Sequence, residues 1–411
     1  MAEPPDRSGA AQPGAGAAAG SAVAAPLALM LAVQTMLSMA TLTVPVLAPV
    51  AKAELAVPPG AVGLYTALLY GGAMVSTLIG GALVPRLGAV RASQLCLVLA
   101  ALAMLATLPM LAVVIAAGAL LLGIGYGPAT PASSDVLARV TPPAWRGLVF
   151  SLKQSGVPLG GALAGLVVPW LVLTVGWPLA GPVVGAACLL LALALEPWRR
   201  RLDIPNRLPP TGVPLMALAR VLTPIRRALA EPAIARLAWC SFLFAMLQHA
   251  LGTFLVSHLV ASAGLSLGAA GGVLAVAQIS GAVARIVWGA VADRLLAPAT
   301  MLALLALAMA AGATGTALVD GTTPWGVLIA IAVLFGASAV GWNGVYLAEV
   351  ARLAPRGAVA EITGGCLAIT YLGVMIGPVA FAALVSTTGF ATAYVSHAGL
   401  ALVAVYLLVR R

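Results

Sequence analysis

The chain alternates long apolar stretches with short polar breaks from about residue 24 to its C-terminal end. A helix needs about 20 predominantly apolar residues to cross a bilayer. Because the stretches reach this length and lack the strict alternation of barrel strands, they predict an all-α integral membrane protein. We expect twelve spans at about 24–50, 61–84, 91–109, 112–138, 147–173, 177–196, 233–262, 267–292, 298–319, 323–352, 359–386 and 389–409.

The composition agrees with this pattern. The chain is 62% hydrophobic and only 8% charged, and its mean hydropathy of +1.09 lies outside the range of soluble domains. The segment 1–22 is rich in Ala, Gly and Pro, so we expect a disordered tail there. It lacks the pattern of a cleaved secretory signal.

The basic residues are distributed unevenly about the predicted spans. Lys52 alone falls on one side, and eighteen arginines fall at the tail, loops or span edges of the other. The positive-inside rule therefore predicts a protein of the cell (inner) membrane with both termini cytoplasmic. The net charge of +10 reflects this topology and not nucleic-acid binding. The eighteen are Arg7, Arg86, Arg91, Arg139, Arg146, Arg199, Arg200, Arg201, Arg207, Arg220, Arg226, Arg227, Arg236, Arg294, Arg352, Arg356, Arg410 and Arg411.

The sequence also repeats itself. The motif at 81–86 recurs at 289–294, the glycine motif at 156–161 recurs at 373–378, and Gln34 is matched by Gln248, with offsets of 208, 217 and 214 residues. Matches in order at nearly constant offset predict two six-helix bundles in parallel repeat, 23–196 and 233–411. The arginine-rich segment 197–232 would be a cytoplasmic linker with room for a surface helix.

This organisation resembles the major facilitator superfamily. The resemblance rests on the twelve spans in two halves and on Gly289, Asp293 and Arg294 after the eighth span. The copy after the second span keeps Gly81 and Arg86, but Pro85 replaces the aspartate. The resemblance implies alternating access around a central site, with loop charges that lock the cytoplasmic side. The first-half copy therefore lacks the acidic residue of this lock, whereas the second-half copy keeps it.

Two charged pairs near the same ends of the fourth and tenth spans add to this picture. Asp135 and Arg139 are four residues apart, and Glu349 and Arg352 are three apart, so each pair shares a helix face. The pairs could form a charge network between the halves that is made and broken in each cycle. Alternatively, they are local ion pairs of little energetic weight.

The fifth span carries small residues at helical spacing. Gly156 and Gly160 share one face, and Gly161 and Gly165 share the next. This spacing predicts close helix packing. The motif is also similar to an antiporter signature of the superfamily, but Pro158 is displaced from the signature's position. We therefore do not predict an antiporter from it.

Two cations lie inside predicted spans. By the rise of a helix, Arg285 lies about ten ångströms inside the cytoplasmic end of the eighth span. Lys153 lies at a similar depth in the fifth span. Arg285 shares its face with small residues and Gln278, which suits a water-filled cavity better than lipid. Two such cations would attract a substrate carboxylate. The alternative is that both side chains snorkel to the headgroups.

A second resemblance supports the anion interpretation. Arg285 precedes Gly289 by four residues and Asp293 by eight, which is similar to the arginine of monocarboxylate porters and oxalate/formate antiporters that contacts the substrate carboxylate. Cyanate-type transporters share this arginine pattern. Gly281 stands where the monocarboxylate porters place an aspartate, so their proton-coupling pair cannot be assumed. The oxalate/formate antiporters carry their second cation on the eleventh span, not on the fifth.

Further polar and aromatic residues inside spans are candidates for the cavity. They could bind substrate, or they could pack in the core. His249 could relay protons or be a packing histidine. The other candidates are Gln34, Gln248, Trp342, Asn343 and Tyr371.

These features favour a secondary transporter for a small organic anion. The alternative is a proton-coupled exporter of drugs or organic cations, which usually needs a carboxylate deep in the bundle. Here Asp135, Glu349 and Glu361 lie near span ends. Three scattered histidines and no phosphate-binding motif argue against an enzyme or a nucleotide-driven pump.

The remaining expectations concern cofactors and partners. All four cysteines fall within spans, without metal-ligand spacing, so we expect no disulfide, metal or cofactor. The expected partners are a small-molecule substrate, the bilayer, and protons or a counter-anion. The transporter should function as a monomer.

Overall fold

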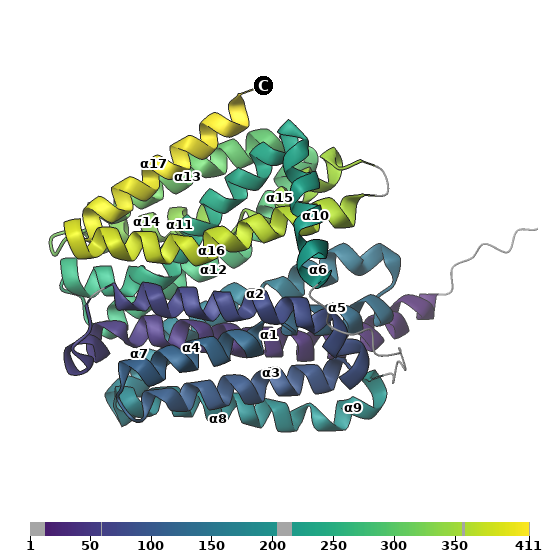
Figure 1. Cartoon of the computed structure of the whole chain (residues 1–411), viewed down its shortest axis with the longest axis horizontal. Coiled ribbons are helices and arrows are strands. Elements are labelled where there is room, and N and C mark those ends of the chain that lie inside the picture. Colours follow the sequence, from purple (N-terminus) through teal and green to yellow (C-terminus); the bar gives the residue numbers. More distant parts are fainter. Residues whose placement is uncertain (1–12, 59, 204–215, 356–357, 411) are drawn as a thin grey trace, which may run out of the picture.

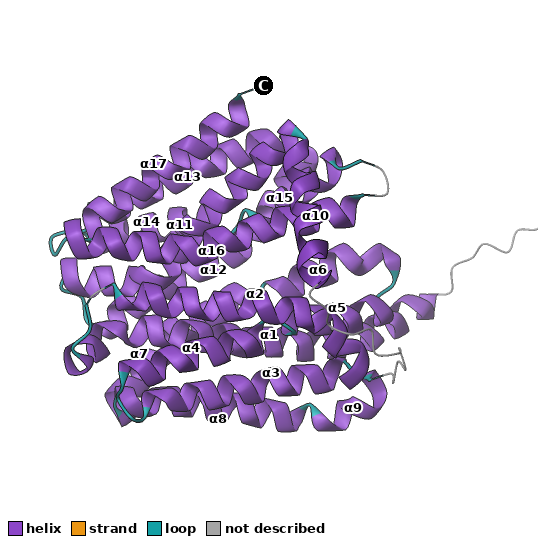
Figure 2. Cartoon of the chain, in the orientation of Figure 1, coloured by secondary structure: helices purple, strands orange, loops and turns teal. Residues whose placement is uncertain are grey.

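The computed structural model describes residues 13–58, 60–203, 216–355 and 358–410. In these ranges the backbone forms helices joined by short turns, with no strand (Figure 2). Eleven segments are long and apolar enough to cross a membrane, and Ala61–Thr77 is a shorter apolar helix. The prediction of an all-helical membrane protein is confirmed.

The helices fall into two groups along the chain. The first group, drawn purple to blue-green in Figure 1, precedes the segment 204–215 and occupies one half of the molecule. It comprises α1 (Pro13–Leu55), α2 (Ala61–Leu87), α3 (Ala89–Met104), η1 (Leu105–Thr107), α4 (Ala112–Tyr126), α5 (Ala129–Val140), η2 (Pro143–Trp145), α6 (Arg146–Gln154), α7 (Gly156–Val175), α8 (Trp177–Ala194) and α9 (Glu196–Leu202).

The second group occupies the other half of Figure 1, from blue-green to yellow. It comprises α10 (Met216–Ala230), α11 (Pro232–Ser262), α12 (Leu267–Arg294), α13 (Pro298–Ala317), α14 (Trp325–Ala339), α15 (Asn343–Leu353), α16 (Val359–Thr388) and α17 (Phe390–Val409). We call the two groups the first half and the second half.

Three stretches that the sequence predicts as single spans are broken helices. The breaks separate α4 from α5, α6 from α7, and α14 from α15. Pro128 lies at the first break, and Pro158 follows the second by three residues. Proline has no N–H and cannot complete the helical ladder, which accounts for these two interruptions. The third break, at residues 340–342, contains no proline.

The ends of the predicted bundles differ from expectation. Helix α1 begins at Pro13, within the segment predicted to be a disordered tail, and residues 1–12 lie outside the described residues. The alanines of this segment favour helix strongly enough to extend α1 backwards. In the predicted linker, α9 and α10 flank the undescribed residues 204–215, and α10 packs on α11 and α16.

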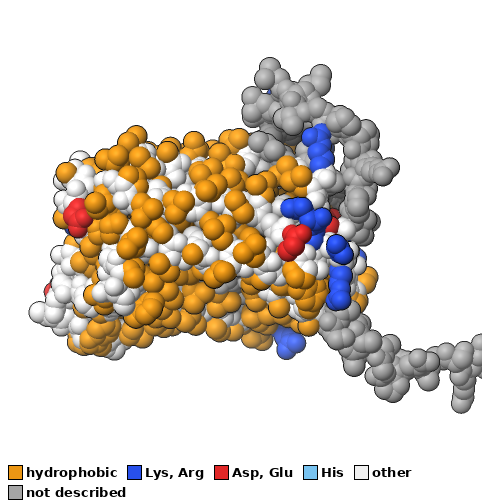
Figure 3. Space-filling model, turned by 90° about the horizontal axis from the view of Figure 1, so that it is seen from below, with side chains coloured by type: hydrophobic (Ala, Val, Ile, Leu, Met, Phe, Trp, Pro, Cys, Tyr) orange, Lys and Arg blue, Asp and Glu red, His pale blue; other side chains and the backbone are white. Residues whose placement is uncertain are grey.

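The two ends of the molecule differ in charge. On the face drawn in Figure 3, hydrophobic side chains cover the middle of the molecule, and Lys and Arg gather at one end. We call this the basic end; it carries the ends of α9 and α17 (Figure 1). Lys52, Glu54 and Asp320 belong to the opposite end.

The halves pack against each other mainly away from the basic end. Helix α2 packs on α16, and α7 packs on α12. A side-chain carbon on Gly63 would overlap the Pro378 carbonyl, and one on Gly271 would overlap that of Gly165. Glycine therefore allows both helix pairs to approach closely near the opposite end.

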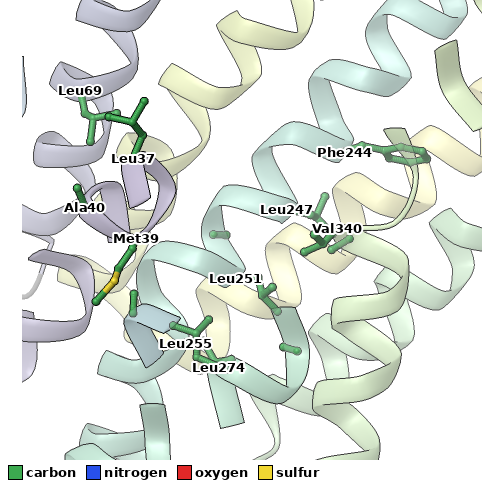
Figure 4. Close-up of a cluster of buried hydrophobic side chains, with 14 of the residues drawn as sticks. Leu37, Met39, Ala40, Leu69, Phe244, Leu247, Leu251, Leu255, Leu274 and Val340 are labelled. Carbon is green, nitrogen blue, oxygen red and sulfur yellow. The ribbon is translucent and has the colours of Figure 1, made fainter. Parts of the chain in front are cut away.

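Apolar cores lie on both sides of this interface. Figure 4 shows Leu37 and Ala40 of α1 with Leu69 of α2, and Leu251 of α11 with Leu274 of α12. These five side chains are at most 1% exposed. Each half thus buries its own apolar surface.

Candidate functional site

Arg285 lies at the interface between the halves. Its Nε donates to the Val340 carbonyl at 3.0 Å, and its Nη1 donates to the Gln154 carbonyl at 3.0 Å. Val340 belongs to the second half and Gln154 to the first. The partly buried guanidinium therefore joins the two halves through backbone carbonyls.

Lys153 is adjacent to one of these partners. Its side chain is only 1% exposed, and its ammonium donates to the Gln154 side-chain oxygen at 3.1 Å. It therefore does not extend to solvent, as a snorkelling lysine would. Both cations predicted to bind substrate converge on Gln154, one through its side chain and one through its backbone.

Neither cation has a carboxylate partner among the described side chains. The ion pairs of these residues join Arg139 to Asp135, Arg199 to Glu196, Arg227 to Glu361 and Arg352 to Glu349. Arg285 and Lys153 instead bind neutral oxygens. Burying unpaired charge is costly, so this site carries positive charge that an anion could neutralise.

Polar groups of α1 and α4 lie beside the arginine. The Gln34 amide donates to the Tyr126 hydroxyl at 3.2 Å and, more weakly, to Ser38 at 3.4 Å. The Arg285 guanidinium lies near the same tyrosine hydroxyl. The Oε1 atom of Gln34 is buried without a hydrogen-bond partner.

A group of aromatic side chains continues this polar surface. The Tyr70 ring lies 6.1 Å from that of Tyr126 and 4.6 Å from that of His249, edge-on in both cases. Tyr371 lies close to Tyr70 and Tyr126. Because His249 belongs to the second half and packs on Tyr70 of the first, this pair is a contact between the halves.

The structure separates the other predicted binding residues. Gln278 is 6% exposed and lies against Gly161 of α7, at the interface between the halves. Trp342 is buried in the second half, where its Nε1 donates to Gln248 at 3.0 Å. Trp342 and Gln248 thus satisfy each other. The Asn343 amide lies 3.5 Å from the Val340 carbonyl that Arg285 also uses.

The two charged pairs at the basic end are local in this conformation. Arg139 contacts Asp135 at 2.9 Å, and both belong to α5. Arg352 donates two bonds of 2.7 Å to Glu349 within α15. Glu349 is 2% exposed, so this carboxylate is buried but fully engaged by its arginine.

The predicted loop signatures are described only in part. Gly81 belongs to α2 and Arg86 is exposed, whereas the Asp293 side chain lies outside the described residues. A side-chain carbon added to Gly289 would have no described atom within 4 Å, and Arg294 is exposed at the end of α12. The role of the second-half signature in a cytoplasmic lock therefore stays a prediction.

Where the first-half signature lacks its aspartate, another carboxylate is close by. Asp203, after α9, accepts hydrogen bonds from the Val90 and Arg91 amides at 2.7 and 3.3 Å. A carboxylate there stabilises the N-terminal end of α3. The preceding Gly88 has φ of +88°, and a side-chain carbon on it would overlap the Asp203 carboxylate.

A separate cavity of about 430 Å³ lies toward the opposite end, between α1, α2 and α4. Its walls are mostly apolar, but Lys52 is among them, and Trp177 of α8 and Ser257 and Phe390 of the second half also line it. It contains neither Arg285 nor Lys153, so it is distinct from the cationic site. Among the described residues, no group of three His, Cys, Asp or Glu side chains could hold a metal, and the four cysteines are buried thiols.

Sequence reasoning missed several residues of the site. Tyr70 and Tyr126 are tyrosines inside apolar spans, and a polar hydroxyl in such a position could have marked them as candidates. Gln154 acts through its backbone carbonyl, a role that residue type does not reveal.

The sequence matches the family model of the Major Facilitator Superfamily over residues 27–365. The chain therefore belongs to this superfamily of membrane transporters. No curated protein matches it in sequence.

Solved structures show the same fold at low sequence identity. A point mutant of the nucleoside transporter NupG is 16% identical, with a TM-score of 0.73 over 93% of this chain and 98% of that one. An inward-facing, unoccupied bacterial homologue of the human lysosomal transporter Spinster is 17% identical, with a TM-score of 0.70 over 94% and 95%. A peptide transporter POT in complex with sulfate is 17% identical, with a TM-score of 0.73 over 93% of both chains.

Proposed function

We propose that this chain is a secondary transporter that carries a small organic anion by alternating access. The main support is the cationic site: Arg285 and Lys153 both bind Gln154, and no described carboxylate neutralises either cation. A substrate carboxylate would supply the missing charge and accept two parallel bonds from the guanidinium.

The surroundings of the site support a small substrate with polar groups. Tyr126 and Gln34 present hydroxyl and amide groups next to Arg285, and Gln34 has an unused acceptor. Tyr70, Tyr371 and His249 would form an aromatic wall on the side away from the basic end. The known neighbours carry nucleosides or peptides, so the fold alone does not select a substrate.

The proposal includes a topology. Twelve spans would form two six-helix bundles, 23–196 and 233–411. The protein would lie in the plasma (inner) membrane of the cell, with the basic end and both termini in the cytoplasm. The eighteen arginines against Lys52 support this orientation. The protein would function as a monomer.

The conformation in hand would be open toward the cytoplasm. The close glycine contacts between α2 and α16 and between α7 and α12 lie toward the opposite end. The pairs Asp135–Arg139 and Glu349–Arg352 are local here. In the opposite conformation these charges would be free to pair across the halves, as the lock hypothesis requires.

Uptake into proteoliposomes tests the proposal. A panel of labelled mono- and dicarboxylates and cationic drugs would be offered to the wild type, Arg285→Gln and Arg200→Gln, with and without an imposed pH gradient. Arg200 is an exposed arginine of α9 and serves as the charge-matched control.

We expect one or more carboxylates to enter wild-type and Arg200→Gln vesicles. In Arg285→Gln the half-saturating concentration should rise about tenfold to a hundredfold, because a charge-assisted bond is lost. Transport of cationic drugs without any carboxylate, or normal transport by Arg285→Gln, would refute the proposal. Dependence on the pH gradient would identify proton coupling.

A further inference from the structure

The bond between Arg285 and Gln154 has a cause in the sequence of the fifth predicted span. In a helix, the carbonyl of residue 154 accepts from the N–H of residue 158. Pro158 has no N–H, so it leaves the Gln154 carbonyl without its helical donor. Arg285 of the other half fills this vacancy, with its Nη1 at 3.0 Å.

The second bond of the guanidinium has the same character. Val340 is the C-cap residue that follows α14, and the chain turns before α15 begins at Asn343. The Val340 carbonyl therefore lies at a helix end, where carbonyls lack helical donors. It accepts from Arg285 Nε at 3.0 Å. Arg285 thus binds one carbonyl in each half that lacks a helical N–H donor, and each of these carbonyls lies at a break between two helices.

We propose that Pro158 is a positioning residue that keeps the Gln154 carbonyl available as an internal ligand of Arg285. This inference rests on the proposed role of Arg285 in anion binding. The carbonyl holds the guanidinium, and with it the second half, against the first half while the site is empty. A substrate carboxylate competes for the same donor and releases the bond between the halves.

The competition favours the anion once it arrives. A guanidinium binds a carboxylate through two charge-assisted bonds, whereas it binds the Gln154 carbonyl through one bond to a neutral oxygen. The carbonyl therefore gives the partly buried guanidinium a hydrogen-bond acceptor without outcompeting substrate. Binding is coupled in this way to the inter-half movement that alternating access needs.

A second proline of the chain also leaves a carbonyl without its helical donor, but the side chain that binds this carbonyl comes from the same half. Pro182 of α8 cannot donate to the Pro178 carbonyl, and the Thr107 hydroxyl donates to that carbonyl at 2.8 Å. Thr107 and α8 both belong to the first half. Pro182 thus provides the same chemistry without a bond between the halves.

The test compares Pro158→Ala with Pro182→Ala. Alanine restores the N–H at each position, so the helix can satisfy its own carbonyl. Spin labels on Ala138→Cys and Ala351→Cys, exposed residues of α5 and α15 near the basic end, report the separation of the halves without substrate. The four native thiols are buried.

We expect Pro158→Ala to broaden and lengthen this distance distribution and Pro182→Ala to leave it unchanged. In an Arg285→Gln background, Pro158→Ala should have no further effect, because the bond is already absent. Equal effects of Pro158→Ala in both backgrounds, or none in either, would overturn the proposal. If Pro158→Ala does not fold, Pro158→Gly supplies the same N–H.

The competition itself is tested by uptake of the carboxylate that the wild type carries best. Without the internal ligand, Pro158→Ala should be half-saturated at a concentration at least threefold lower, and Pro182→Ala should match the wild type. An unchanged or higher value contradicts competition. The distance measurement contains no substrate, so it distinguishes failure of this inference from failure of the transport proposal.

Discussion

The two cations of the site differ in how they are held, and this difference determines what their removal should do. Arg285 binds two carbonyls and joins the halves. Lys153 makes a single bond, to a neutral side chain, although it is 1% exposed. An ammonium held this poorly is retained at a cost to stability of several kcal/mol, which is expected of a functional group.

Lys153→Met should therefore raise stability and lower activity. Removal of a poorly satisfied buried charge should increase the apparent melting temperature by about 2 °C or more. Carboxylate uptake should fall at least about tenfold if the ammonium contributes a charge-assisted bond. Thermal unfolding in detergent and proteoliposome uptake measure the two effects.

Lys52→Met is the control, since Lys52 is the other lysine of the chain and lies near the opposite end of α1. It should leave both quantities close to their wild-type values. A Lys153→Met protein that is less stable and fully active would show that the lysine has a structural role.

At the scale of the helices, the glycines of α7 allow two close contacts on neighbouring faces. Gly156 and Gly160 face α1, where side-chain carbons would overlap Gln34 and Ser38. Gly161 and Gly165 face α12 of the other half, against Gln278 and Gly271. The close packing expected from their spacing is confirmed, and one of the two faces forms the interface between the halves.

Gly271→Ala tests whether this contact closes the opposite end. The added carbon would overlap the Gly165 carbonyl, and overpacking of this kind costs about 1–3 kcal/mol. The halves should separate there, which a longer distance between spin labels on Ala53→Cys and Thr322→Cys would report. The adjacent Gly272 has open space around it, so Gly272→Ala should change nothing. Equal distances in the two variants would contradict this role.

Helix existence could be predicted from the sequence, but helix continuity and tertiary partners could not. Twenty apolar residues have few alternatives to a helix in a membrane. The breaks at Pro128 and Pro158 were visible only as prolines, and the break at residues 340–342 carried no such signal. Neither Gln154 nor Asp203 stood out, because their partners come from segments distant in the chain.

At the scale of the whole molecule, the charge asymmetry makes a prediction about orientation. If the basic end is cytoplasmic, Thr322→Cys at the opposite end should react with a membrane-impermeant thiol reagent on intact cells. Arg201→Cys at the end of α9 should react only after permeabilisation. The buried native cysteines give a low background. The reverse labelling pattern would refute the proposed topology.

The central claim is that the site between the halves recognises negative charge. Its most direct test is to compare uptake of the best carboxylate substrate with uptake of its primary amide, which has nearly the same shape but no charge. We predict that wild-type vesicles take up the carboxylate at least tenfold faster, and that Arg285→Gln loses this preference. Equal uptake of both compounds by the wild type, or an unchanged preference in Arg285→Gln, would contradict the claim.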